Sequence, residues 1–349
     1  MIQPDKGLCH RVFFQKMRQP DKTSAGCFLQ HIKSTGKKSD MTKTKASIFS
    51  GFTAVITAAL LWAASGSFAK YLFNAGLSPF DLVQIRLTVA VFCIAVFLLF
   101  RSPEKMLIPI KKLPQYLFLG VFGMAAMQAT YLLAISRIQV AAAILLQYLA
   151  PVLIVIWQVL FQQKHPSSRV IMALCAAVAG SALVLDLASM NFKAMSGIGI
   201  LAGLGAALTF AIYSLAGEAR MKEEGPETVV FYAMLIAAIL WNILRPPFSG
   251  FTALGNDIPT WALALAIGCF GTALPFFLYL YGVRIIGASP ASITGTLEPV
   301  FAGILCFFLL AEIFNTLQLS GAILVITAVI LLQLPDKRNL SYHAQNPSS

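Results

Sequence analysis

The sequence predicts an all-α integral membrane protein with ten transmembrane helices, arranged as two inverted five-helix repeats. Three observations lead to this fold class: a very apolar composition, ten apolar runs of membrane-spanning length, and an internal sequence repeat. Of the 349 residues, 58% are hydrophobic and only 11% are charged. A soluble chain carries about 25% charged residues, because its surface must be solvated. The composition therefore excludes an ordinary soluble protein.

Ten apolar runs are long enough to form membrane helices. A helix that crosses a hydrocarbon core of about 30 Å needs about 20 apolar residues, and backbone groups in lipid must bond within their own helix. A barrel would instead show alternating segments of about ten residues. In chain order the runs are Ile48–Ala69, Leu82–Phe100, Tyr116–Ile135, Val140–Phe161, Val170–Leu187, Gly197–Ala216, Thr228–Leu244, Thr260–Val283, Ala288–Ala311 and Phe314–Leu334. Short segments rich in turn formers, such as Glu224-Gly225-Pro226, separate them.

The distribution of basic residues predicts the orientation. When the loops are assigned alternately to the two sides, 21 of the 26 Lys and Arg residues fall on the side of the N-terminus. Only Arg137, Lys193 and Arg245 fall on the other side. Because short loops enriched in Lys and Arg stay cytoplasmic, we expect both termini to be cytoplasmic. The net charge of +12 is then a topology signal, and no aromatic interleaving or motif supports nucleic-acid binding.

The two ends of the chain are predicted to be cytoplasmic tails. Residues 1–47 are polar and basic without helical or strand periodicity, which is typical of a disordered segment. The segment Met41-Thr42-Lys43-Thr44-Lys45, just before the first span, resembles an ordinary start. We therefore expect residues 1–40 to be an upstream-start artefact or a dispensable extension. Residues 335–349 form the second tail.

The sequence repeats itself at an offset of 148 residues. Phe122–Val152 aligns with Phe270–Val300 without a gap, and ten of the 31 pairs are identical. The first apolar run, from Gly51 to Ala63, aligns at the same offset with Gly199 to Ala211. Two stretches that share one offset predict a duplicated five-helix unit, with repeat 1 at residues 48–187 and repeat 2 at residues 197–334.

An odd number of helices per unit makes the second copy enter the membrane upside down. Inverted repeats of this kind place a binding site near the midplane, between the halves, and let it face either side by rocking. The duplication therefore favours a transporter. Channels and membrane enzymes can also be duplicated helical bundles, so these alternatives stay open.

Four short stretches resemble the EamA branch of the drug/metabolite transporter superfamily. They are LLWAASGSF at residues 60–68, SPFDLVQIR at 78–86, the segment from Tyr131 to Pro151, and the segment from Leu297 to Glu312. The resemblance covers about residues 47–334. The family usually has a Glu at the end of the fourth helix, and this chain has Lys164 there, whereas Glu312 keeps the acid in the second half.

The resemblance implies a secondary transporter of the inner, cytoplasmic membrane of a prokaryote. Its substrate would be a small organic metabolite such as an amino acid or a related compound, with export the commoner direction. The alternatives are an uncoupled channel or facilitator for small solutes and a multidrug exporter. Partners would be the lipid bilayer, the substrate and protons.

Glu298 is the sharpest candidate for a coupling residue. It lies about 15 Å into its predicted span, at 1.5 Å per residue, which is half the hydrocarbon core. A charged group at that depth costs about 2.5–3.5 kcal/mol on insertion scales, so it should face a cavity or a partner. Glu298 is predicted to bind a proton or a cation, and the alternative is a hydrogen-bonding anchor between helices.

Pro151 and Pro299 occupy equivalent positions in the two repeats. Each proline leaves the carbonyl four residues earlier without its usual donor, and such carbonyls are tolerated in a membrane where a neighbour, water or ligand satisfies them. We predict hinges that line the cavity, with passive kinks as the alternative.

The remaining candidate cavity residues are polar or aromatic side chains inside the spans. Arg86, which the resemblance favours, would select for anions if it faces inward, but both it and Lys70 can instead snorkel to the interface. The aromatic residues can equally pack against lipid or other helices. The full set is Trp62, Arg86, Gln128, Tyr131, Gln147, Tyr148, Tyr213, Tyr279 and Thr294.

The sequence gives little support for an enzyme or a cofactor. The four histidines lie in tails or a loop, so a Ser/His dyad and an HExxH zinc site are absent. No GxxxxGK[ST] sequence is present, which excludes a self-contained ATP-driven pump. The six cysteines are scattered without a CxxC, so we predict small apolar fillers and neither a disulfide framework nor a zinc site.

Overall fold

The computed structural model describes residues 47–334 except 67, 70, 74, 188–194 and 311–314. Every regular element in these residues is a helix, which confirms the all-α prediction. The predictions for both tails, for Lys70 and for Glu312 lie outside the described residues.

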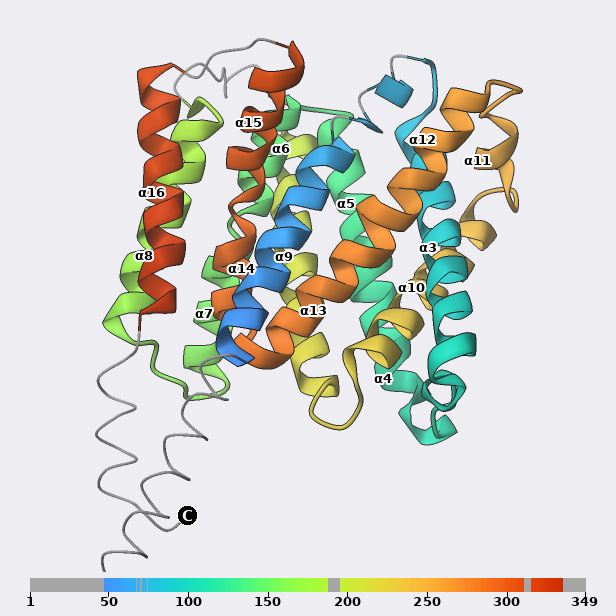
Figure 1. Cartoon of the computed structure of the whole chain (residues 1–349), viewed down its shortest axis with the longest axis horizontal. Coiled ribbons are helices and arrows are strands. Elements are labelled where there is room, and N and C mark those ends of the chain that lie inside the picture. The colour runs from blue at the N-terminus through green and yellow to red at the C-terminus, as the bar shows by residue number, and fades with distance from the viewer. Residues whose placement is uncertain are drawn as a thin grey trace, which may run out of the picture. The chain divides into compact units, whose positions relative to one another are not determined.

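Eight helical segments of the described residues are long and apolar enough to cross a membrane. Some consist of several consecutive elements, as Figure 1 shows for α12 and α13. Five are single helices: the first helix (Ser47–Phe73), α3 (Pro79–Arg101), α9 (Gly197–Arg220), α10 (Pro226–Leu244) and α16 (Thr316–Gln333). The segment Ile110–Ile135 contains α4 (Leu113–Phe118), η3 (Leu119–Ala125) and α5 (Ala126–Ile135), and the segment Val140–Leu160 contains α6 (Val140–Gln147) and α7 (Ala150–Leu160). The segment Ile258–Ile286 contains α12 (Ile258–Gly268), η6 (Cys269–Ala273) and α13 (Leu274–Ile286).

The other two predicted spans correspond to shorter helices. The fifth is α8 (Ser168–Val184), an apolar helix of 17 residues. The ninth is divided into α14 (Ala288–Gly295) and α15 (Glu298–Leu310). A short helix, α11 (Ser249–Thr252), lies between α10 and α12.

The helices are interrupted at equivalent places in the two repeats. A two-residue turn separates α6 from α7, and another separates α14 from α15; the offset of 148 places one interruption on the other. Pro151 and Pro299 each take the second position of the helix that follows, where a missing N–H breaks no helical bond. The predicted continuous runs Val140–Phe161 and Ala288–Ala311 are therefore each two helices.

The repeats also share a π-helical segment in their third helix. The segments are η3 in the first half and η6 in the second. The offset superimposes η6 on the last five residues of η3. Such segments interrupt the regular bonding of an α-helix and are frequent at functional sites.

Equivalent residues make reciprocal contacts between the halves. A Cβ at Gly51 would lie 2.9 Å from Ile286, and one at Gly199 would lie 2.6 Å from Ile138; the two contacts are related by the 148-residue offset. Gly271 against Ser65 and Gly123 against Tyr213 form a second such pair. The first helix of each half therefore packs on the third helix of the other half, and Figure 1 shows the first helix alongside α13.

Close helix approach at small residues, as predicted for Gly120, Gly123, Gly199, Gly203, Gly268 and Gly271, is confirmed. A Cβ at Gly268 would lie 2.5 Å from Val89, and one at Gly203 would lie 2.6 Å from Leu146. The pair α8 and α16, side by side in Figure 1, uses Gly180 and Gly321 in the same way: each would place a Cβ 2.7 Å from the other's carbonyl oxygen. Small residues let the backbones approach closely where lipid offers no hydrophobic driving force.

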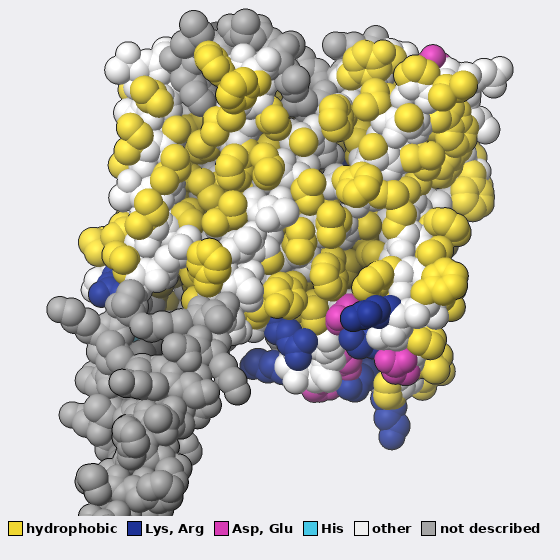
Figure 2. Space-filling model, in the orientation of Figure 1, with side chains coloured by type: hydrophobic (Ala, Val, Ile, Leu, Met, Phe, Trp, Pro, Cys, Tyr) yellow, Lys and Arg dark blue, Asp and Glu magenta, His cyan; other side chains and the backbone are white. Residues whose placement is uncertain are grey.

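The outer surface suits a bilayer. Large apolar side chains such as Phe92 and Phe100 are 70% and 89% exposed, and Figure 2 shows hydrophobic side chains over most of the visible described face. Lys and Arg gather with Asp and Glu at one end (Figure 2). Among the charged residues, Lys105 pairs with Glu227 at 3.1 Å. A broad apolar surface on a multi-helix body is that of a multi-pass membrane protein.

Candidate functional site

Arg86 faces the interior of the helix bundle. Its Nε donates to Oγ1 of Thr272 at 2.9 Å, and its Nη2 donates to the carbonyl oxygen of Gly271 at 3.2 Å. Both acceptors belong to η6, so a cation of the first half is held by the second half. The structure shows the inward alternative for Arg86, and the snorkelling alternative was wrong.

Four of the predicted residues gather around the helix interruptions. The four are Arg86 of α3, Tyr131 of α5, Tyr148 in the turn between α6 and α7, and Glu298 at the start of α15. Glu298 interacts electrostatically with each of the other three, and Tyr131 also interacts with Arg86 and Tyr148. We call these four residues the polar cluster. The Tyr148 hydroxyl lies near the Glu298 carboxylate without the geometry of a full hydrogen bond. The polar cluster joins residues of both halves.

The charges of the polar cluster do not neutralise each other directly. No direct ion pair joins Arg86 and Glu298 among the described residues. Arg86 instead uses neutral acceptors in η6. A cation and a carboxylate that share a site without a direct pair can each interact with an oppositely charged group of a ligand.

Several predicted cavity residues carry buried polar atoms without a hydrogen-bond partner in the described part of the chain. These atoms are Trp62 Nε1, Gln128 Nε2 and the hydroxyls of Tyr148 and Tyr213. Leaving a buried donor unpaired costs about 1–3 kcal/mol. Five further buried atoms of this kind lie on other residues, so the feature is not confined to the site, but it recurs at four of the predicted cavity positions.

The aromatic candidates form a second group between the first helix, α9 and α13. The Trp62 ring centroid lies 5.2 Å from that of Phe276 and 5.6 Å from that of Tyr279. The Tyr279 hydroxyl is 2.6 Å from Ser214 Oγ, and Tyr213 contacts Phe276 edge to face at 5.7 Å. Tyr279 is fully buried, so it supports the packing of this group.

Two other candidates lie at the helix interruptions. Gln147 is half-buried at the last position of α6. Thr294 is fully buried, and its hydroxyl donates to the carbonyl oxygen of Pro290 at 2.8 Å. The Thr294 donor is thus used within its own helix.

The residues that hold Arg86 were not among the predicted site residues. Thr272 is a fully buried polar side chain within a predicted span, and that polarity is a signal available in the sequence. Gly271 was interpreted only as a packing residue. Its role as an acceptor depends on the backbone of η6, which no residue type specifies.

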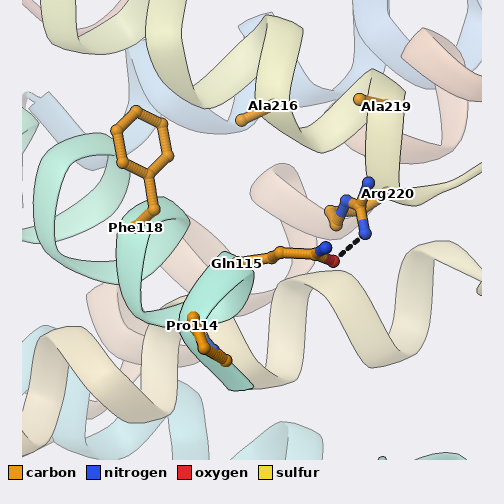
Figure 3. A pocket seen from close by; sticks show the side chains of 6 residues that line it. All are labelled: Pro114, Gln115, Phe118, Ala216, Ala219 and Arg220. Carbon is orange, nitrogen blue, oxygen red and sulfur yellow. Dashed lines mark hydrogen bonds between the residues drawn. The ribbon is translucent and has the colours of Figure 1, made fainter. Parts of the chain in front are cut away.

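A shallow pocket of about 350 Å³ lies away from the polar cluster, between α4 and α9. Pro114, Gln115, Phe118, Ala216, Ala219 and Arg220 line it (Figure 3). Arg220 donates a hydrogen bond to the Gln115 side chain across it. None of the predicted site residues lines this pocket. No group of three or more His, Cys, Asp or Glu residues that could hold a metal occurs among the described positions.

Comparison with known proteins gives similarities over most of the chain. Residues 49–186 and 197–334 each match the EamA-like transporter family; the two matches are offset by 148 residues. The inner membrane transporter YicL of Salmonella typhimurium is 29% identical over 293 residues, which cover 82% of this chain and 96% of that protein. The threonine/homoserine exporter RhtA of Escherichia coli is 26% identical over 215 residues, 61% of this chain and 68% of that protein.

A solved crystal structure shares the fold. It superimposes with a TM-score of 0.67 and covers 86% of this chain and 99% of its own. The sequence identity is 18%, so the likeness concerns the arrangement of helices alone.

Proposed function

The chain belongs to the EamA-like transporter family, since both of its halves match that family, and we propose that it is a secondary-active exporter of a small organic metabolite. Relatives support this proposal: YicL is an inner membrane transporter, and RhtA exports threonine and homoserine. We therefore propose that the substrate is an amino acid or a related compound and that the protein lies in the inner membrane of a prokaryote.

In the proposed topology, ten helices form two inverted units of five, with both termini cytoplasmic. The helix α8 acts as the fifth span, and α14 with α15 acts as the ninth. The reciprocal contacts of Gly51 and Gly199 support a two-fold relation between the halves. Five spans per unit require the second unit to be inverted.

The observation that carries the proposal is the polar cluster between the halves. Arg86 and Glu298 come from different repeats, and no direct ion pair joins them in the described part of the chain. Charged groups inside a membrane are expensive and mark substrate or ion pathways. A site that is shared by the two halves can change the side it faces when the halves rock.

The helix interruptions before Pro151 and Pro299 are the proposed hinges. Each places a two-residue turn beside the polar cluster, at Tyr148 in one half and directly before Glu298 in the other. A discontinuous helix lets its two parts change angle while each stays helical. Rocking around these turns would alter the surroundings of Tyr148 and Glu298 together.

Proton coupling through Glu298 is the mechanism that we propose. The test is transport in proteoliposomes, with and without a pH gradient, by the wild type and by Glu298→Gln. We expect Glu298→Gln to lose the stimulation by the gradient, because the amide cannot bind and release a proton. The matched control is Glu218→Gln in α9, which should keep the stimulation.

Two outcomes would count against this mechanism. If Glu298→Gln keeps a wild-type response to the pH gradient, Glu298 is not the coupling residue. If the wild type conducts solute without saturation and without response to any gradient, the protein is an uncoupled facilitator.

A further inference from the structure

Two cysteines that are 176 positions apart meet between the two halves of the molecule. Sγ of Cys93 in α3 and Sγ of Cys269 in η6 lie 2.7 Å apart. A disulfide bond measures about 2.05 Å, so the sulfurs need to approach by less than one ångström. Both are free thiols, and both are half-buried. The prediction that each is merely an apolar filler does not account for this pairing.

The thiol pair lies at membrane depth. Cys93 is about 21 Å along α3 from Pro79, at about 1.5 Å per residue, and both cysteines pack against the apolar group around Leu82, Ile85 and Val89. Water-soluble thiols such as glutathione, which keep cytosolic cysteines reduced, do not enter this apolar region. Lipid-soluble quinones do enter it, and they accept two electrons.

We propose that Cys93 and Cys269 are an oxidation site for membrane quinones. One S–S bond forms as both S–H bonds break, and the two electrons and two protons pass to the quinone, which becomes a quinol. The product is a disulfide that joins α3 of the first half to η6 of the second half.

The position of the bond gives it a consequence for transport. Cys269 stands two and three residues before Gly271 and Thr272, which hold Arg86. The disulfide would fix η6 to α3 at the polar cluster and oppose rocking of the halves. This consequence rests on the proposed function, whereas formation of the disulfide does not.

The test of disulfide formation uses a full-length variant that retains only Cys93 and Cys269, with a protease site inserted after Lys164 in the exposed segment between α7 and α8. The protein in proteoliposomes is treated with decylubiquinone, cleaved, and analysed on a non-reducing gel. We expect the two fragments to remain joined until a reductant is added. Two fragments that separate without reductant, with both thiols still open to alkylation, would overturn the proposal.

A matched control keeps Cys93 and Cys175 and carries Cys269→Ser. Cys175 is an exposed cysteine of α8 on the same fragment as residue 269. We expect no link in this variant. A link as strong as that of the Cys93/Cys269 variant would show indiscriminate oxidation and would also overturn the proposal.

Transport is measured on the same vesicles before and after quinone treatment. We expect at least a fivefold loss in the Cys93/Cys269 variant, recovery with a permeant reductant, and no loss in Cys93→Ser. If the protein forms the disulfide and its transport is unchanged, the proposed effect of the disulfide on transport is wrong, whereas the oxidation site stands. If the protein transports nothing even when reduced, the result counts against the proposed function, since the gel reports the disulfide independently.

Discussion

For Arg86, the depth of the residue in the membrane and the direction of its side chain have to be predicted separately. Its place in the sequence, about 6 Å past the start of the predicted span at 1.5 Å per residue, indicated depth and was compatible with snorkelling. The bonds to Thr272 and Gly271 come from the packing of α3 on η6, and they join residues 186 and 185 positions apart. The periodicity of the sequence does not predict which residue of another helix a side chain contacts.

We predict that Arg86→Lys and Arg86→Gln both impair transport. A lysine has a single compact charge and cannot reproduce the fork that reaches two acceptors. Hydrogen bonds to charged groups contribute about 1.5–3 kcal/mol, so KM should rise roughly tenfold or more in Arg86→Gln and less in Arg86→Lys. Saturation curves in proteoliposomes measure this, and an unchanged KM in Arg86→Gln would remove Arg86 from the site.

We predict that Glu223 makes a pH-dependent contribution to the stability of the fold. Lys112 lies 2.8 Å away and holds the pKa of the Glu223 carboxyl below its ordinary value of 4.5. A carboxyl with a lowered pKa stabilises the folded state above its ordinary pKa, and this contribution is lost as the pH falls through the lowered value. Glu223 is exposed, so the effect is small.

The measurement compares melting temperatures of wild type and Glu223→Gln in detergent. The variant should melt slightly lower at pH 7, and the difference should shrink as the pH falls below 4.5 and through the lowered pKa of the wild-type carboxyl. A difference that persists undiminished as the carboxyl is protonated would contradict the ion-pair explanation.

At the scale of helices, the sequence predicted the spans better than their internal form. The apolar runs located the eight long apolar helical segments of the described residues, because length and hydropathy are summed over many residues. Pro151 and Pro299 marked the two interruptions. The extent of each interruption, and the π-helical form of η3 and η6, depend on neighbouring helices that fix the backbone, so residue type alone does not predict them.

Contacts between helices give a stability prediction at Gly282. A Cβ there would clash with Val55 Cγ2 and would lie 2.9 Å from the Gly51 carbonyl oxygen. Overpacking of this kind typically costs 1–3 kcal/mol, so Gly282→Ala should lower the melting temperature. Adding Val55→Ala should restore part of the loss, because it removes the nearer clash.

The matched control is Gly66→Ala in the first helix, where a Cβ would meet nothing within 4 Å. Alanine favours a helix over glycine by about 0.8–1.0 kcal/mol, so this variant should be as stable as the wild type or more so. If Gly282→Ala behaves like Gly66→Ala, the first helix and α13 do not pack closely enough at Gly282 for a methyl group to clash, which would contradict this prediction.

For the whole molecule, the internal sequence repeat predicted several features of the structure. The 148-residue offset recurs in the paired helix interruptions, in the reciprocal glycine contacts and in the two matches to the EamA-like transporter family. The duplication could be predicted from the sequence because it leaves identical residues in register. The contacts between the halves could not be predicted, because pairs such as Arg86 with Thr272 and Cys93 with Cys269 connect positions that the offset does not relate.

We propose that the polar cluster belongs to a site that opens to either side of the membrane. Gln147, half-buried beside Tyr148, reports on it when changed to Cys in a cysteine-free background. We predict that a membrane-impermeant thiol reagent labels this cysteine from the cytoplasmic side and from the outer side, with substrate shifting the balance between the two. Labelling from one side only, whatever the substrate or gradient, would contradict alternating access.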